Sequence, residues 1–210
     1  MTDRDSHALR ELGVADAGEA WAAAGFAVED DAVVIGETTI RLIGTDGARG
    51  IRSAVVQGID VEVDGLPFAP GPGAAPAEAP PHPNGVDAID HLVAMSPDMD
   101  RTTAALEGAG LEARRTRRFE VGGATQRQTF FWLGTTILEL AGDDAAHGDG
   151  PAVLWGLALT CADLDATVSV LGDHAGAPKA AVQRDRRIAT LRTRDLDISV
   201  PIALMSPHPA

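Results

Sequence analysis

A short segment that occurs twice constrains the fold of this chain more than any other feature. Residues 96–106 align without a gap on residues 161–171, and both copies contain Asp-x-Asp near the start, then Thr, then a final Leu. Aspartate is a preferred N-cap of helices, and each copy follows an apolar stretch, residues 89–95 and 153–160, typical of a buried strand. The repeat therefore predicts two modules that each begin with a strand followed by a helix.

Three further strands are predicted after each helix. In the first copy they cover residues 111–121, 125–133 and 136–141. In the second copy they cover residues 180–183, 187–192 and 198–205. The order strand, helix, strand, strand, strand thus occurs at residues 88–142 and again at residues 153–206, and it predicts an α+β fold of repeated βαβββ modules.

A weaker third copy precedes these two modules. Residues 35–44 align on residues 133–142, and an Ala-rich helix is predicted at residues 15–24. We identify no strand before this helix, and residues 51–59 are a candidate replacement for it. Residues 8–65 are therefore predicted to form a partial, degenerate N-terminal βαβββ-like module.

Between this part and the repeat lies a segment rich in Pro, Ala and Gly, residues 66–87. Proline lacks a backbone N–H and disfavours helices and central strands. The segment is therefore predicted to be an extended, solvated linker. It precedes a domain of two modules at residues 88–206.

Two short motifs carry a resemblance to a known family. Residues 89–93 read Ile-Asp-His-Leu-Val and residues 137–140 read Ile-Leu-Glu-Leu, on the first and last predicted strands of one module. Together with the paired modules, they resemble the vicinal-oxygen-chelate superfamily of glyoxalase I, extradiol dioxygenases and bleomycin-resistance proteins. The resemblance implies modules curled into a cup-shaped mixed sheet with helices outside and the ligand inside. It also implies that His91 and Glu139 are ligands of a divalent metal (Zn, Ni, Mn or Fe), with Glu139 also catalytic.

The second module departs from this pattern. Gly156 stands where the first module has His91, and residues 199–205 contain no carboxylate to match Glu139. The N-terminal copy has Arg41 at the corresponding position. A partner chain or His174 could supply a further ligand, and the expected cofactor is a divalent metal or none.

Side chains on the predicted strands suggest a ligand pocket. Gln126, Gln128, Phe130 and Trp132 alternate along one strand and therefore share a face, which would line a cup or form an interface between modules. Trp155, beside the position equivalent to His91, is a candidate pocket wall or core residue.

Arginines are concentrated before this strand. Arg114, Arg115, Arg117 and Arg118 form the densest basic cluster, with Arg115 a candidate pocket residue, and Arg186-Arg187 repeats the feature in the second module. They are interpreted either as a clamp for a carboxylate-bearing substrate or as a solvated face.

Composition limits the partners and the location. A net charge of -14 argues against nucleic acid and anionic membranes and favours neutral or cationic small ligands. No apolar run is long enough for a membrane helix and no signal peptide is recognised, so a cytoplasmic, and by its Arg-rich composition bacterial, protein is expected. The unpaired third copy makes a homodimer plausible, because open sheet edges tend to be covered.

Two functions remain open from the sequence. One is isomerase or lyase chemistry, possibly metal-assisted, on a small carbonyl or hydroxylated metabolite, with Glu139 as the catalytic residue. The other is non-catalytic sequestration of a small molecule, as the bleomycin-resistance branch of the resembling family implies.

Overall fold

An eight-stranded mixed sheet is the main feature of the computed structural model, which describes residues 6–71, 76 and 78–209. Its strand order is β10-β11-β12-β9-β5-β8-β7-β6. The first module comprises β5 (Val86–Met95), α2 (Met99–Gly108), β6 (Arg115–Val121), β7 (Ala124–Leu133) and β8 (Thr136–Asp143). The second comprises β9 (Val153–Cys161), α3 (Leu164–Leu171), β10 (Lys179–Ala180), β11 (Arg187–Thr190) and β12 (Ile202–Met205), with 3-10 turns at Gly172–His174 and Thr193–Leu196.

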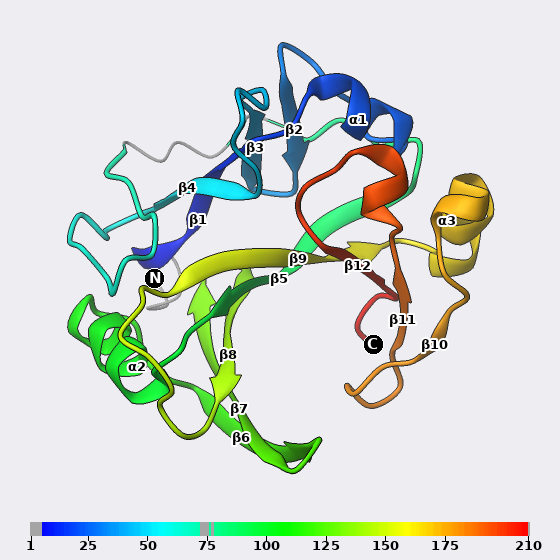
Figure 1. Ribbon diagram of the computed structural model, residues 1–210. Helices are drawn as coiled ribbons and strands as arrows, with labels where there is room; N and C mark the ends of the chain where they lie inside the picture. The colour runs from blue at the N-terminus through cyan, green and yellow to red at the C-terminus, as the bar shows by residue number, and fades with distance from the viewer. Residues whose placement is uncertain (1–5, 72–75, 77, 210) are drawn as a thin grey trace.

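The two modules pair their strands in the same way. In each, the first strand runs parallel to the last, β5 beside β8 and β9 beside β12, and the modules join where β5 pairs antiparallel with β9. The sheet curls into a half-barrel, with α2 and α3 outside it (Figure 1). The predicted α+β fold with a cup-shaped sheet is confirmed.

The aspartate shared by the two repeated segments caps a helix in each copy. The Asp98 side chain accepts a hydrogen bond of 3.0 Å from the backbone N–H of Arg101, and Asp163 caps α3 in the same way. Such caps typically stabilise a helix by about 1 kcal/mol. The repeated threonines, Thr102 and Thr167, lie on the buried faces of α2 and α3.

The last strands of the second module are shorter than the sequence predicts. β12 begins only at Ile202, whereas a strand was expected from residue 198. A 3-10 turn ends at Leu196, and Asp197 adopts a left-handed conformation with φ of 57°. Pro201, which has no N–H to donate to a ladder, directly precedes the strand.

The N-terminal part forms a second, four-stranded sheet of order β2-β3-β1-β4. Its elements are β1 (Leu9–Val14), α1 (Gly18–Ala23), β2 (Ala32–Ile35), β3 (Thr38–Leu42) and β4 (Ile51–Val56). The expectation that no strand precedes the helix is wrong, because β1 precedes α1. The apolar pattern of β1 is interrupted by Arg10, Glu11 and Gly13, so it is not recognisable from sequence. β1 runs parallel to β3, and β4 pairs antiparallel with β1, as β9 does with β5.

This sheet shares one apolar core with the eight-stranded sheet. Asp16 connects the two, since its carboxylate accepts hydrogen bonds from the Trp21 indole N–H (3.0 Å) and the Ser199 backbone N–H (2.9 Å). No helix in the described part of the chain is long and apolar enough to cross a membrane.

The Pro-rich segment, expected to be solvated, is docked at its C-terminal end. His82 and Asn84 are both buried, and Asn84 donates a hydrogen bond of 2.9 Å to the Ala24 carbonyl. Because its ring is buried, the pKa of His82 is lowered, although a hydrogen bond to the Val34 carbonyl opposes this shift. Residues 72–75 and 77 of the predicted linker lie outside the described residues.

Candidate functional site

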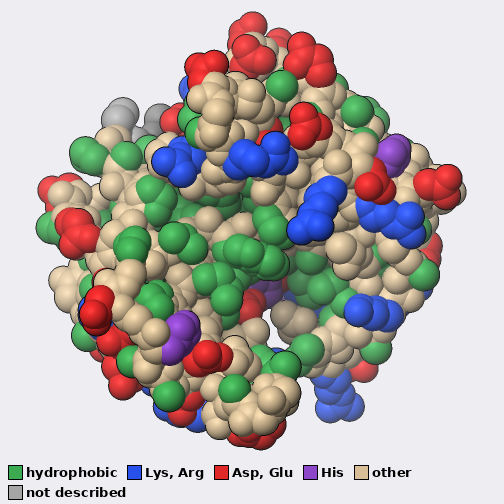
Figure 2. Space-filling view, viewed as in Figure 1, with side chains coloured by type: hydrophobic (Ala, Val, Ile, Leu, Met, Phe, Trp, Pro, Cys, Tyr) green, Lys and Arg blue, Asp and Glu red, His purple; other side chains and the backbone are tan. Residues whose placement is uncertain are grey.

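The concave face of the half-barrel encloses a cavity of about 840 Å³, lined by strands of both modules. A second opening of about 490 Å³ adjoins it and shares His91, Arg117 and Phe130. Figure 2 shows the hollow, with Lys and Arg side chains around its rim and hydrophobic side chains within it. The cup therefore has room for a metabolite-sized ligand.

Strand register places most of the predicted site residues on this face. Glu139 of β8 lies opposite Val93 of β5 on one side and Phe130 of β7 on the other, and residues opposite one another share a face. The larger cavity is lined by five of the candidates, His91, Gln128, Phe130, Glu139 and Trp155. Trp132 and Arg115 line the smaller opening.

Gln126 lies apart from the other candidates. It occupies the same face of β7 but lines a separate hollow of about 320 Å³ beside Met95. Its side-chain amide contacts the Asp143 carboxylate. The structure thus places Gln126 at the far end of the face, outside the cup.

A β-bulge brings Asp90 beside His91. Opposite β9, Ile89 pairs with Leu159 and His91 pairs with Ala158, so Asp90 is an extra residue on β5. A bulge turns two successive side chains toward the same side of a sheet. The Asp90 carboxylate accordingly contacts His91 Nδ1, and both side chains are buried. Because a carboxylate only accepts, Nδ1 carries a proton, which leaves Nε2 as the ring nitrogen available to a ligand.

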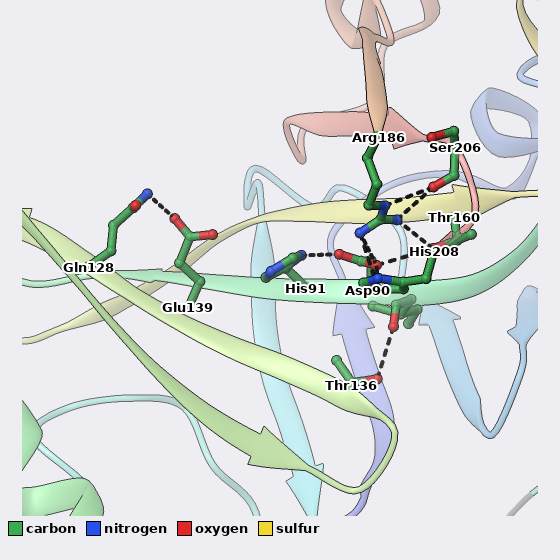
Figure 3. A network of polar contacts seen from close by, with 10 residues as sticks. Asp90, His91, Gln128, Thr136, Glu139, Thr160, Arg186, Ser206 and His208 are labelled. Atoms are coloured by element: carbon green, nitrogen blue, oxygen red, sulfur yellow. Dashed lines mark hydrogen bonds and ion pairs between the residues drawn. The ribbon is translucent and has the colours of Figure 1, made fainter. Parts of the chain in front are cut away.

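The second module and the tail after it hold Asp90 in place. Arg186 Nη1 lies 2.8 Å and His208 Nε2 lies 3.1 Å from Asp90 Oδ1 (Figure 3). Arg186 also donates to the Ser206 carbonyl at 2.7 Å. Burial alone would raise the pKa of Asp90, but the contacts with His91 and Arg186 outweigh it and lower this pKa to about 2. Asp90 is therefore a buried anion at neutral pH.

Sequence reasoning missed the roles of Asp90, Arg186 and His208. From sequence, Asp90 is recognised only as part of the His91 motif, and nothing in the sequence distinguishes His208. The one signal was a carboxylate inside an apolar strand, which must find a partner when buried.

Glu139 is a half-buried carboxylate within the cavity. It accepts a hydrogen bond from the Gln128 side-chain amide. Burial raises the pKa of Glu139, and the contrary effects of His91, Gln128 and Arg117 do not cancel the increase. Gln128 Oε1 is buried without a hydrogen-bond partner among the residues that the structure describes. It is a free acceptor for a ligand N–H or O–H.

The arginine cluster divides between the surface and the cup. Arg118 pairs with Asp144 at 2.9 Å, and Arg187 pairs with Asp165 at 2.6 Å. Arg115 and Arg117, in contrast, form no ion pair in the described part of the chain and line the cup. The interpretation as a solvated face fits Arg118 and Arg187, whereas Arg115 and Arg117 face the cavity.

The donor set offers little to a metal ion. A Cβ atom at Gly156 would lie 2.8 Å from the Pro201 carbonyl oxygen, so that position cannot carry a histidine without a backbone shift. No group of three or more His, Cys, Asp or Glu suited to a metal occurs among the residues described. His91 and Glu139 are two donors, one fewer than the protein ligands of catalytic zinc sites. These residues alone do not fit the metal that the fold family implies.

Comparison with known proteins identifies the fold. No protein-family model and no curated protein matches the sequence. A mutant of 4-hydroxymandelate synthase from Streptomyces coelicolor is 15% identical, with a TM-score of 0.61 over 99% of this chain and 93% of that chain. Methylmalonyl-CoA epimerase from Mycobacterium tuberculosis is 16% identical, with a TM-score of 0.46 over 60% of this chain and 91% of that chain. 4-Hydroxymandelate synthase has the fold of the vicinal-oxygen-chelate superfamily, and the resemblance predicted from sequence is confirmed at the level of fold.

Proposed function

We propose that the protein binds a small carbonyl or hydroxylated metabolite in the cup and catalyses isomerase- or lyase-type proton transfer on it. The observation that carries the proposal is a half-buried Glu139 of raised pKa in the same cavity as His91. A carboxylate whose pKa is raised toward neutrality is a stronger base than an ordinary one. Perturbed groups in a cleft of this kind are typical of proton-transfer sites.

The proposed reaction begins with Glu139. Its carboxylate takes a proton from a carbon next to the ligand carbonyl, the C–H bond breaks, and its electron pair moves toward the carbonyl oxygen to form an enolate. Arg117 is close enough to lower the pKa of Glu139, so its positive potential reaches the same space and stabilises the enolate. The protonated Glu139 then returns the proton to the same carbon, which restores the carbonyl compound, or the enolate expels a leaving group from the next carbon and Glu139 gives its proton to that departing group.

His91 would orient the ligand in this scheme. Its Nδ1 is held by Asp90, and its ring packs edge-on against Phe130 with centroids 6.3 Å apart. The ring orientation is therefore constrained on two sides. Nε2 is left to contact a hydroxyl or carbonyl group of the ligand.

The test is hydrogen exchange without turnover. α-Keto acids and α-hydroxy ketones are incubated with the protein in deuterium oxide, and loss of the C–H signal next to the carbonyl is followed by proton NMR. Glu139→Gln is expected to slow exchange at least about 100-fold, the typical contribution of a positioned base. Glu120→Gln, an exposed acid outside the cup, is the matched control. Exchange that is absent with every compound, or unchanged in Glu139→Gln, would refute the proposal.

The second candidate is a protein that binds a ligand without chemistry. It is favoured by Gly156, which cannot be replaced by a histidine without a backbone shift, and by the largely apolar wall of the cavity, where His91 and Glu139 are the two metal donors among the described residues. Tight binding of a compound that undergoes no exchange in the wild-type protein would support this function over the enzyme.

A further inference from the structure

We infer that the ligand of the cup is an amphipathic anion, with its negative group at Arg117 and its apolar body against the floor of the half-barrel. This inference names the ligand class for the site proposed above and rests on the cup being a binding site. It runs against the overall charge, since the chain has 31 Asp and Glu but only 17 Lys and Arg. The cup has a charge of the opposite sign.

The side chains that line the two openings set this local charge. They include one carboxylate, Glu139, and five cations, Arg114, Arg115, Arg117, Lys179 and Arg194. Arg114 is neutralised by Glu112 at 2.7 Å. The other four cations have no such partner in the described residues. Glu139 is near enough to Arg117 to feel its charge, but it is one carboxylate beside four cations that form no ion pair, so a bound anion would balance the remaining positive charge.

Most other described cations of the protein form ion pairs, so the absence of ion pairs is largely confined to the cup. Ten arginines of the described residues form ion pairs with carboxylates. Six described cations form none: Arg52, Arg115, Arg117, Lys179, Arg192 and Arg194. Four of these six line the cup. In a protein with so many acids, cations without a carboxylate are concentrated where a ligand would lie.

Arg117 occupies the central position. It lines both openings, and it is half-buried, whereas Arg115, Lys179 and Arg194 are exposed. Its guanidinium lies over the Phe119 ring, 4.7 Å from the centroid, which fixes the side chain without neutralising it. Attraction of a charge is less screened at a partly buried cation than at exposed ones.

The rest of the cavity suits an apolar body. Its walls include Phe130, Trp155, Val182, Ile202 and Met205. Trp155 and Val182 are 51% and 74% exposed, although large apolar side chains are usually covered. Aromatic and aliphatic walls with a few placed polar groups are typical of small-molecule sites.

A pair of dyes tests the inference with the full-length protein. Anilinonaphthalene sulfonate and N-phenylnaphthylamine share an aromatic body, but only the first carries an anionic group. We expect the sulfonate to bind at least about tenfold more tightly, and the preference to weaken with added salt. Arg117→Gln should reduce that preference about fivefold or more. Adding Lys179→Gln and Arg194→Gln should reduce it further, and both positions are exposed, so these changes should leave the fold undisturbed.

Arg52→Gln and Arg192→Gln are the matched controls, because they remove unpaired cations that do not line the cup. Equal binding of the two dyes, or an equal loss of sulfonate binding in the controls, would overturn the inference. Glu139→Gln separates the two proposals, since it removes the base but leaves the four cations and should retain the preference. Proton exchange without a preference for the anionic dye would refute the inference and leave the proposed function standing.

Discussion

Replacement of Asp90 by Asn is expected to destabilise the protein strongly. The Asp90 and Arg186 side chains are 3% and 1% exposed and lie 2.8 Å apart. Removing one partner of a buried ion pair typically costs about 3 to 5 kcal/mol, because the other charge stays buried without compensation. Arg186 keeps its bonds to the Ser206 carbonyl, so we expect about 3 kcal/mol for Asp90→Asn.

The pKa of Asp90 provides an independent magnitude. Its decrease from 3.8 to about 2 on folding corresponds to about 2 kcal/mol of stability at neutral pH. Since the folded-state pKa is the lower one, this contribution is present above pH 3.8 and is lost as the pH falls toward about 2. The Asn variant should lack this part of the acid dependence.

Urea unfolding followed by circular dichroism at neutral and acidic pH measures both effects. Asp165→Asn, which breaks the exposed ion pair with Arg187, is the matched control and should lower the urea midpoint much less than Asp90→Asn. The double variant Asp90→Asn with Arg186→Met should cost less than the sum of its single changes, by about 1 to 3 kcal/mol. If Asp90→Asn costs no more than Asp165→Asn, or if the double variant is additive, the buried ion pair does not stabilise the fold as reasoned.

Three further predictions concern the cup. Proton exchange should increase as the pH rises through the raised pKa of Glu139, above 4.5, because only the ionised form is a base; a pH-independent rate would contradict this. Gly156→Ala should lower the free energy of unfolding by about 1 to 3 kcal/mol through its clash with Pro201, whereas Gly108→Ala, with open space around it, should not; equal denaturation midpoints would be inconsistent with this. After incubation with Zn²⁺ and dialysis, plasma mass spectrometry should find less than one metal ion per chain; one ion per chain, lost in both His91→Ala and Glu139→Ala, would show that the site is completed from elsewhere.

Local patterns were sufficient to predict the two modules, but not the first strand of the N-terminal sheet. Asp98 and Asp163 cap helices through their own neighbours, so a repeat of a few residues reveals them. β1 is recognisable only through its pairing with β3 and β4, which are distant in the sequence. No strand is recognised there from sequence because Arg10 and Glu11, which form ion pairs with Glu37 and Arg41, interrupt the apolar pattern.

Of the candidate site, the sequence could predict the residues that alternate along one strand, but few of the contacts between them and distant parts of the chain. Gln128, Phe130 and Trp132 share a face because a strand has period two. The environment of His91 depends on Arg186 and His208, which the fold brings from far along the chain. The net charge of the chain does not describe the cup, because Glu139 is the one carboxylate among its described lining residues, whereas four of the six described cations without an ion pair line it.

The bulge in β5 also shows how apolar residues determine the position of polar ones. Ile89 and Leu92 are both buried in the core, although residues three apart in a regular strand point to opposite faces. One extra residue between them resolves this conflict, and burying each of the two side chains contributes about 2 kcal/mol. Deletion of Asp90 would therefore leave the core unable to hold Ile89 and Leu92 together while His91 faces the cup. The orientation of the residues that face the cup is in this sense a property of the hydrophobic core beneath them.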